Sequence, residues 1–341
     1  DYDKAQSLVD LAYKNGVNYF DTAYMYHCGK SEAFIGYALK KYPRDTYFIA
    51  DKLPIWMCDT KEDMKRVFDE QLERTGMDYF DFYLLHSLDN ENFEKCEKFD
   101  AYDFLKQMQK EGKIKYIGFS FHGTVDDLRN IVSAHKWDFA QIQMNYLDWE
   151  NQNAKMQYQI LEEAGIPTIV MEPVRGGKLA LVNDEISDMF KSLKPNNSPA
   201  SWAMGFVASH KNIITILSGM NSAEQMLDNL STLTDFKPFT DIEYSLCEKA
   251  ATIINKSEVI SCTGCDYCQP CPKGIKISSF FSLYNSVVSG EIDINSGRDK
   301  YNSYKVNPTA CAWCNKCKNH CPQSISVPDV LEGKVVKLFM Q

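Results

Sequence analysis

Residues 1–255 alternate between short apolar segments and longer stretches with helical period, and this alternation limits the possible folds more than any other feature. The segments that we expect to form strands are 17–21, 46–52, 81–86, 116–120, 139–143, 167–172 and 212–219. Helical patterns such as 31–42 and 63–76 lie between them, and several end at a glycine. A repeated strand–helix–strand order requires parallel pairing, with helices covering the sheet. We therefore expect an α/β fold.

Nearly every expected strand ends in a polar or reactive side chain. These residues include Asp21, Lys52, His86, Ser120, Gln141, Glu172 and Ser218. A (β/α)8 TIM barrel builds its active site from the C-terminal ends of several strands, whereas a doubly wound sheet gathers ligand groups at one switch point after a glycine-rich turn. No G-x-G-x-x-G follows an early strand here, so the barrel is favoured. Seven strands are counted where eight close a barrel, so we expect either a first strand upstream of this sequence or an open barrel.

Residues 256–341 differ in composition from the rest of the chain. Eight of the twelve cysteines lie here, in "CTGCDYCQPCP" (262–272) and "CAWCNKCKNHCP" (311–322). One amphipathic helical pattern (278–290) separates the two runs. A segment this small holds little core, so we expect it to be held together by what its cysteines bind. We divide the chain into a barrel (1–255) and a small, mainly helical domain (256–341).

Charge and composition exclude several classes of partner. The net charge of −9 and a pI near 5.3 argue against nucleic acid and against an anionic membrane surface. No apolar run approaches the roughly 18 residues of a membrane span, and the sequence opens without a signal peptide pattern. We expect no membrane association and a cytoplasmic location. Clustered cysteines in such a chain favour metal over disulfides.

The second cysteine run has the spacing C-x2-C-x2-C-x3-C-P, which is the bacterial ferredoxin run for a [4Fe–4S] cluster. Its fourth cysteine ligates the other cluster when two are present. The alternative is a pair of four-cysteine zinc sites, but these usually join two C-x2-C pairs across a longer gap. We favour two [4Fe–4S] clusters in a ferredoxin-like module. The expected ligand sets cross between the runs: Cys262, Cys265, Cys268 and Cys321 for one cluster, and Cys311, Cys314, Cys317 and Cys271 for the other.

Four residues at or near strand ends form a proton-transfer set: Asp21, Tyr26, Lys52 and His86. Adding a hydride to a carbonyl leaves charge on oxygen, and a proton must arrive as this charge develops. A tyrosine is a poor acid at neutral pH unless a neighbouring cation stabilises its phenolate. Lys52 is the expected cation, held charged and in place by Asp21. His86 is expected to polarise the carbonyl oxygen or share in a proton relay.

Blocks of the sequence resemble, in order and spacing, those of the aldo/keto reductases, especially the branch with a C-terminal iron–sulfur tail. The blocks are "FDTAYMYHCGKSE", "DKLP", "DYFDFYLLHSL", "GKIKYIGFSFH", "QIQMNYLD", "MEPVRGGKL" and "LSGMNSAEQMLDN". The resemblance implies a (β/α)8 barrel and a catalytic tetrad of Asp21, Tyr26, Lys52 and His86. Tyr26 would be the general acid, and its step of five residues from Asp21 matches the family pattern.

The same resemblance implies a nicotinamide cofactor, NADP(H) or NAD(H). Ser120 and Gln141 would hold the carboxamide, and the residues lining the adenosine-phosphate end would be Ser218, Gly219, Met220, Gln225 and Asn229. The sequence departs from the family pattern at several of these positions. Phe121 replaces the family's asparagine, Met171 replaces the stacking aromatic residue, and 218–229 has no lysine or arginine. Arg175 is an alternative phosphate ligand, and a flavin is an alternative cofactor.

The sequence therefore predicts an oxidoreductase that reduces an aldehyde or ketone with NAD(P)H, in which the clusters pass electrons. A hydride carries two electrons and clusters pass one each, so a second interpretation is a reductase linked to ferredoxin or another redox protein through a flavin. A third is a non-catalytic electron-transfer or regulatory subunit on a barrel scaffold, against which the intact tetrad argues.

Overall fold

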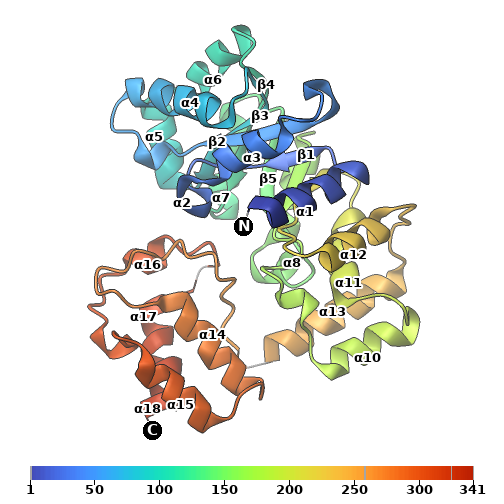
Figure 1. Ribbon diagram of the computed structural model, residues 1–341, viewed down its shortest axis with the longest axis vertical. Coiled ribbons are helices and arrows are strands. Elements are labelled where there is room, and N and C mark those ends of the chain that lie inside the picture. The colour runs from blue at the N-terminus through green and yellow to red at the C-terminus, as the bar shows by residue number, and fades with distance from the viewer. Residues whose placement is uncertain (1, 257–258, 324, 341) are drawn as a thin grey trace. The chain divides into compact units, whose positions relative to one another are not determined.

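Seven parallel strands form the centre of the barrel region (Figure 1). The computed structural model describes residues 2–256, 259–323 and 325–340. The strands are β1 (Tyr19–Asp21), β2 (Phe48–Leu53), β3 (Phe80–Leu88), β4 (Ile114–Phe121), β5 (Phe139–Gln143), β6 (Thr168–Met171) and β7 (Ile213–Ile216). Each pairs in parallel with the next, so the order is β1 to β7 without crossing. This confirms the seven predicted strands, and the described residues form no eighth.

Helices follow the strands as the alternation predicted. Those of the barrel region are α1 (Tyr2–Lys14), α2 (Tyr26–Gly29), α3 (Ser31–Leu39), α4 (Lys61–Thr75), α5 (Asn90–Lys98), α6 (Ala101–Lys110), α7 (Val125–Ala134), α8 (Asp148–Asn151), α9 (Ala154–Glu163), α10 (Asp184–Leu193), α11 (Pro199–Ala208) and α12 (Ala223–Leu233). Short 3-10 turns are η1 (Arg44–Thr46), η2 (Ile55–Met57) and η3 (Lys178–Ala180). Helix α13 (Asp241–Lys256) leads into the cysteine-rich part.

Helix α4 shows how local sequence and packing together position the end of β2. A capping box between Thr60 and Asp63 starts the helix, and Gly76, with a φ of 63°, ends it. On the buried face, the Gln71 amide nitrogen donates to the Lys52 carbonyl oxygen at 2.9 Å and to Asp51 Oδ1 at 2.8 Å. A helix side chain therefore holds the backbone of β2 at Lys52.

The strands approach one another closely inside the barrel region. A Cβ on Gly118 of β4 would lie 2.5 Å from the carbonyl oxygen of Phe139 on β5, so only glycine fits there. A buried cluster lies in the same region, formed by Ala50, Leu84, Phe139 and Ile169. These side chains come from four different strands, as expected for a barrel interior filled by side chains.

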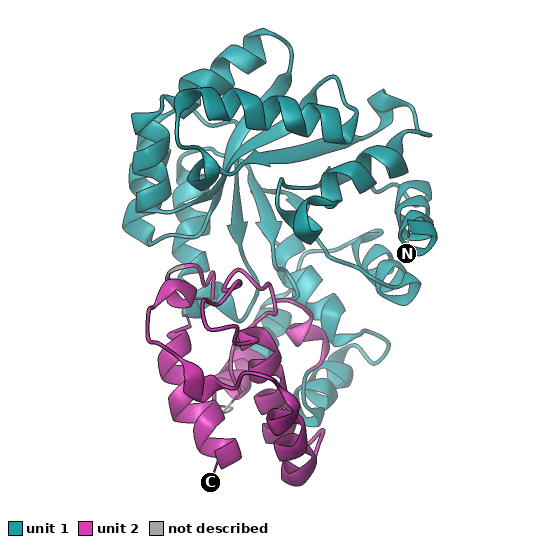
Figure 2. Cartoon of the chain, turned by 60° about the vertical axis from the view of Figure 1, so that its left-hand side comes forward, with its two compact units in different colours: residues 1–174, 182–248 teal, residues 175–181, 249–341 magenta. Residues whose placement is uncertain are grey.

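The chain divides into two compact units (Figure 2). Unit 1 contains residues 1–174 and 182–248, and unit 2 contains 175–181 and 249–341. The structure thus assigns the end of α13 and the segment 175–181 to the cysteine-rich unit. The domain division at residue 255 stays a prediction.

Unit 2 is mainly helical and has an apolar core of its own. Its elements after α13 are α14 (Ile277–Val288), α15 (Ile294–Ser303), η4 (Pro308–Ala310), α16 (Lys316–Asn319), α17 (Val327–Val330), the π-helical turn η5 (Leu331–Val336) and α18 (Lys337–Met340). The buried core residues are Ile260, Ile275, Ile277, Phe280, Phe281, Leu283, Tyr284, Tyr301, Ile325, Val327, Leu331, Val335 and Phe339. This core is larger than the sequence suggested, because its members come from short segments without a long helical period.

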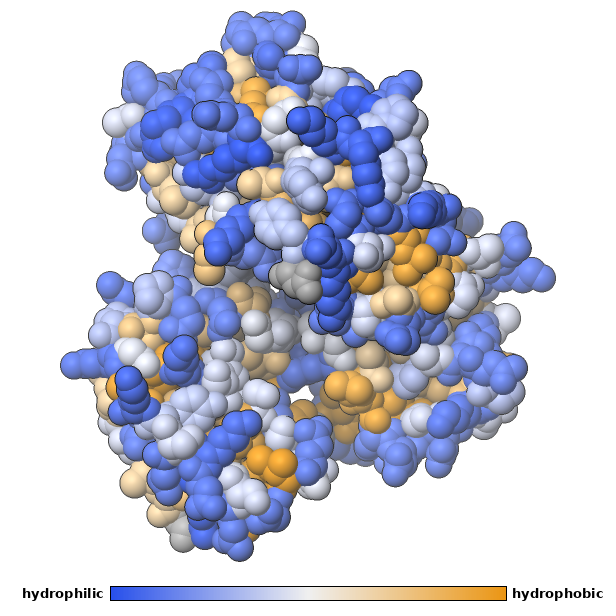
Figure 3. Space-filling model, viewed as in Figure 1, coloured by the Kyte–Doolittle hydropathy of each residue, from blue (hydrophilic) through white to orange (hydrophobic). Residues whose placement is uncertain are grey.

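Hydrophilic side chains cover most of the face drawn in Figure 3, and apolar ones form small separate groups. Within the part of the chain that the structure describes, no helix is long and apolar enough to span a membrane.

Candidate functional site

Lys52, near the end of β2, lies at the centre of the predicted catalytic group. Its ammonium donates to Asp21 Oδ1 at 2.5 Å and to the Thr22 carbonyl oxygen at 2.7 Å, and its side chain is fully buried. Asp21 ends β1, which pairs with β2. Burial raises the pKa of Asp21, and the Lys52 charge opposes this rise. The two strand ends therefore hold an ion pair inside the molecule.

Tyr26 and His86 lie beside this ion pair. Tyr26 is the first residue of α2, directly after β1, and its ring centre is 4.8 Å from Lys52 Nζ. The His86 ring, from β3, is 6.0 Å from the Tyr26 ring in an edge-to-face arrangement. All four residues expected from the sequence are thus brought together at the ends of the first three strands.

His86 is held in its neutral form. Burial lowers the pKa of His86 well below its usual value, and the charge of Lys52 and then His122 lower it further. Its Nδ1 is buried without a hydrogen-bond partner. Trp56, on η2, lies 5.0 Å away between ring centres. A neutral imidazole can donate one hydrogen bond to a carbonyl oxygen but is not a proton reservoir at neutral pH, which leaves Tyr26 as the acid.

Behind Lys52 lies a buried acidic pair that the sequence analysis missed. Asp51 and Glu32 are both fully buried, and Asp51 Oδ2 and Glu32 Oε1 have no hydrogen-bond partner. Glu32 Oε2 accepts from Arg74 at 3.0 Å. Burial, and next the charge of Glu32, raise the pKa of Asp51 well above its usual value. No spacing pattern reveals this pair, because its two residues come from separate elements.

We expect Asp51→Asn to become more stable relative to the wild type as pH rises. A carboxyl whose pKa is higher folded than unfolded loses stabilising free energy above its unfolded pKa, by up to about 1.4 kcal/mol per pH unit until the folded pKa is reached. The asparagine removes this loss. Urea unfolding at pH 5 and pH 8 measures the difference between the two proteins. As a control, Asp81→Asn should destabilise at both pH values, since Asp81 pairs with Arg44 and Lys115. Identical pH dependence of Asp51→Asn and wild type would contradict the prediction.

Two expected nicotinamide ligands are neighbours in the sheet. Ser120 on β4 pairs in register with Gln141 on β5. Ser120 Oγ accepts from the Ser87 backbone N–H at 2.7 Å, which leaves its hydroxyl proton available to donate. Gln141 Oε1 is buried without a hydrogen-bond partner, and its nitrogen lies 3.6 Å from Met171 Sδ. An unpartnered acceptor beside a hydroxyl donor fits a carboxamide, which needs one of each.

The residues expected at the phosphate end surround the start of α12. Asn229 Nδ2 donates to Ser218 Oγ at 3.0 Å, and Gln225 Oε1 accepts from the Asn221 backbone N–H at 2.8 Å. Gly219 and Met220 lie in the connection that precedes the helix. The first turn of α12 also contains Glu224, which the sequence analysis did not single out. Hydrogen bonds from its own backbone N–H and from Ser222 lower the pKa of Glu224, and Lys4 on α1 acts in the same direction.

Some polar and aromatic side chains have other partners than a cofactor or substrate. Arg175 belongs to unit 2, where it is buried, so the structure does not group it with the residues around α12. Tyr24, in the connection between β1 and α2, donates its hydroxyl to Glu70 at 2.6 Å, and the Arg74 guanidinium lies over its ring. Trp149 packs between aromatic rings of the helical layer. Tyr24 and Trp149 thus serve packing and hydrogen bonding.

Comparison with known proteins shows the family to which the chain belongs. The family model described as "Aldo/keto reductase family" matches residues 1–252. The chain belongs to the aldo/keto reductase family. Its members are oxidoreductases, so the enzyme class predicted from the sequence is confirmed. Residues 253–341 lie outside the matched range, and the iron–sulfur branch stays a prediction.

Individual aldo/keto reductases resemble the chain at low identity. It is 24% identical over 270 residues to the NADH-specific methylglyoxal reductase of Escherichia coli, which covers 65% of this chain and 80% of that protein. It is 22% identical over 274 residues to L-galactose dehydrogenase of Arabidopsis thaliana, covering 74% and 84% of the two chains. The solved aldo-keto reductase of Bacillus halodurans superposes with a TM-score of 0.60 at 24% identity, over 73% of this chain and 88% of that one. This last likeness shows the fold.

Outside the family match, the cysteines of unit 2 line two cavities. One is lined by a set that includes Cys262, Cys265, Cys268 and Cys321. The other is lined by Cys268, Cys271, Cys311, Cys314 and Cys317 among others. Each cavity contains cysteines of both runs and includes all four cysteines of one crossed ligand set, while Cys268 lines both cavities.

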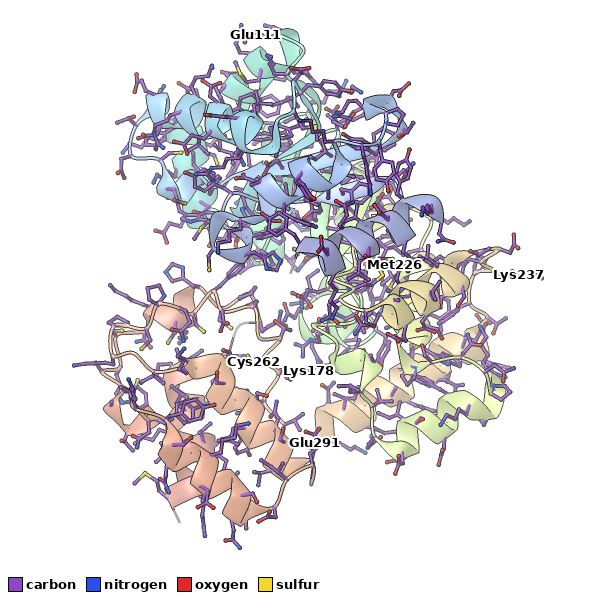
Figure 4. The ribbon with its side chains drawn as sticks, in the orientation of Figure 1. Glu111, Lys178, Met226, Lys237, Cys262 and Glu291 are labelled. Atoms are coloured by element: carbon purple, nitrogen blue, oxygen red, sulfur yellow. The ribbon has the colours of Figure 1, made fainter. Side chains whose placement is uncertain are left out.

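The electrostatics of these thiols reflect the same grouping. Burial raises the pKa of Cys268, and the charge of Cys321 is among the further causes. Burial likewise raises the pKa of Cys317, to which Cys271 contributes. In Figure 4, Lys178 and Cys262 lie close together in unit 2, and the Lys178 charge opposes the rise that burial causes in the pKa of Cys262. Gathering thiolates is unfavourable unless a cationic group joins them, so the donor set fits a metal group.

Among the described residues, no group of three or more histidine, cysteine, aspartate or glutamate side chains is arranged to hold a metal ion.

Proposed function

We propose that the barrel reduces an aldehyde or ketone with NADH or NADPH, and that Tyr26 is the general acid. The observation that carries this proposal is the buried Lys52–Asp21 ion pair beside the Tyr26 ring. The Lys52 ammonium favours the phenolate form of Tyr26 and so makes its hydroxyl a better acid. Neutral His86 donates a hydrogen bond toward the carbonyl oxygen, where negative charge develops.

The nicotinamide cofactor, when bound, supplies the hydride to the carbonyl carbon. Tyr26 gives its hydroxyl proton to the oxygen, the product is an alcohol, and solvent returns a proton to Tyr26. Ser120 and Gln141 hold the carboxamide through the donor and the unpartnered acceptor described above. These residues orient the cofactor on the side of the barrel where the tetrad lies, since Ser120 and Gln141 lie near the C-terminal ends of β4 and β5.

We expect NADH to give a kcat/KM about tenfold or more above that of NADPH. The 2′-phosphate of NADP(H) needs a cation, but 218–229 contains none, and Glu224 adds a negative charge to the first turn of α12. The relative in Escherichia coli is named as NADH-specific. Initial rates with methylglyoxal at matched concentrations of both cofactors measure the ratio. Glu224→Gln should bring the kcat/KM values for NADH and NADPH closer together. A preference of the wild type for NADPH would contradict the expected use of NADH.

We propose in addition that unit 2 holds two [4Fe–4S] clusters in a ferredoxin-like arrangement. The first would be held by Cys262, Cys265, Cys268 and Cys321, and the second by Cys311, Cys314, Cys317 and Cys271. Such clusters exchange single electrons when bound. The cysteine-lined cavities support the proposal, because each combines the two runs.

These cavities also favour a second candidate function, a carbonyl reductase supplied by a one-electron carrier such as ferredoxin. Joining single electrons to a two-electron reduction needs an intermediary such as a flavin. Anaerobic absorption titrations of the holoprotein with NADH, NADPH and reduced ferredoxin separate the candidates. Turnover with NADH alone supports the first, whereas flavin bands and turnover only with reduced ferredoxin support the second. No turnover of any carbonyl would reject both and favour a non-catalytic subunit.

A further inference from the structure

The two cysteine runs of unit 2 repeat one backbone shape. In the first run, Gly264 and Asp266 have left-handed φ angles of 73° and 61°. In the second, Trp313 and Asn315 occupy the equivalent positions with φ of 53° and 58°. The backbone N–H of Gly264 lies 3.4 Å from Cys262 Sγ, and that of Trp313 lies 3.4 Å from Cys311 Sγ. The residue type at each equivalent position can therefore be compared directly.

Trp313 stands where the first run has glycine. A left-handed backbone is costly for a bulky residue and free of cost for glycine, so the backbone does not select tryptophan. Packing does not select it either, because Trp313 is 47% exposed and is not a member of the buried core of unit 2. A large apolar side chain that is both strained and exposed indicates a role outside the fold.

The surface charge around the second run differs from that around the first. Lys316 and Lys318 on α16 are exposed, and no acidic residue lies between Cys311 and Cys321. The first run exposes Tyr267, but its charged residue between the cysteines is Asp266. Residues 249–341 contain eleven lysines and arginines against seven acidic residues, whereas the rest of the chain contains 26 against 39. The exposed indole therefore lies in a segment, 311–321, that carries two exposed lysines and no acidic residue, in an otherwise acidic protein.

We propose that Trp313, Lys316 and Lys318 form the docking surface for an acidic one-electron carrier protein. The proposal rests on the proposed function of unit 2 in redox chemistry. An exposed aromatic anchor with cations at its rim is typical of protein interfaces, and the charges select a partner of opposite sign. In each encounter the carrier loses one electron and unit 2 gains one. Two encounters therefore deliver two electrons to unit 2, one at a time.

The test uses the full-length holoprotein under anaerobic conditions, with an acidic ferredoxin as the probe and calorimetric titration as the measurement. Lys316→Glu combined with Lys318→Glu should raise the Kd at least tenfold at low salt, and the difference should shrink as salt rises. The matched control reverses two exposed lysines of the same unit, Lys300 on α15 and Lys337 on α18, at the opposite end from α16 (Figure 1). The control should leave the Kd unchanged.

Trp313→Gly separates docking from a structural role. Glycine suits the left-handed backbone, so the variant should keep or raise the thermal midpoint while it raises the Kd for ferredoxin about tenfold. A lowered midpoint with an unchanged Kd would assign the indole to stability and overturn the proposal. NADH-dependent carbonyl reduction should be unaffected in both docking variants.

Reduction potentials and iron content distinguish a failure of the docking surface from a failure of the proposed clusters. If Lys316 and Lys318 only neutralise the thiolates, their reversal will shift the reduction potentials of unit 2 without changing the Kd, and this result would also overturn the docking surface. Iron and sulfide content tests the proposed clusters separately. A protein without iron whose Kd still responds to the variants would keep the docking surface and reject the clusters.

Discussion

Tyr26→Phe is expected to lower kcat for carbonyl reduction by about 10²- to 10⁴-fold, the range typical of a lost general acid. The substitution removes only the hydroxyl, so the ring remains beside Lys52 and His86. Cofactor affinity should change little, because the proposed nicotinamide contacts come from β4 and β5. Single-turnover rates with NADH and a carbonyl, together with cofactor titration, measure the two effects separately.

Tyr24→Phe provides a matched control two residues away. The Tyr24 hydroxyl donates to Glu70 and accepts from Arg74 at 3.1 Å, so its loss should cost about 1 kcal/mol of stability and leave kcat near the wild-type value. If Tyr26→Phe retains more than about a tenth of the wild-type kcat, general acid catalysis by Tyr26 is rejected. Equal losses in both variants would point to a general disturbance of α2 and β1.

Cys321→Ser is expected to remove about half of the bound iron and sulfide, since each [4Fe–4S] cluster depends on its full set of cysteine ligands. The cluster lost should be the one that Cys262 also holds, because Cys321 lines a cavity with Cys262, Cys265 and Cys268. Iron and sulfide analysis with electron paramagnetic resonance of the reduced protein measures the loss. Cys28→Ser, which alters an exposed thiol outside unit 2, should keep all of the iron.

Double variants decide whether the ligand sets cross. If they do, Cys262→Ser with Cys321→Ser disables one cluster, whereas Cys311→Ser with Cys321→Ser disables both. If each run instead holds its own cluster, Cys262→Ser with Cys321→Ser disables both clusters, and Cys311→Ser with Cys321→Ser disables only one. The apolar core of unit 2 comes from residues outside the cysteines, so circular dichroism should retain helical signal in the single variants.

The barrel part of the site was largely predictable from the sequence. Asp21, Lys52 and His86 follow apolar segments whose strand character is a local property, and parallel strands bring their carboxyl ends to one edge. Their proximity to Tyr26 followed once the strand order was known. Asp51 and Glu32 were not predictable in this way, because two carboxyls become a pair only when β2 and α3 pack together. The hydrogen bond from the Gln71 side chain to the Lys52 carbonyl oxygen could not be predicted either, because it also forms between two separate elements.

In unit 2, even less of the structure could be predicted from the sequence. The cysteine spacings indicated the kind of group to be held, but not the size of the apolar core, which collects residues from Ile260 to Phe339 in short separate elements. The exposure of Trp313 in a left-handed conformation was also invisible, since nothing in "CAWC" distinguishes a buried indole from an exposed one.

The sequence by itself determined the alternation of strands and helices, the reactive residues at the strand ends and the two cysteine runs, because periodicity and spacing act over a few neighbouring residues. Only the tertiary structure decided that His86 is neutral, that Gln141 keeps an unpartnered oxygen, that Arg175 belongs to the other unit and that each cavity combines both runs. Burial, charge proximity and cavity shape arise between segments far apart in the chain, so they exist only after the chain has folded.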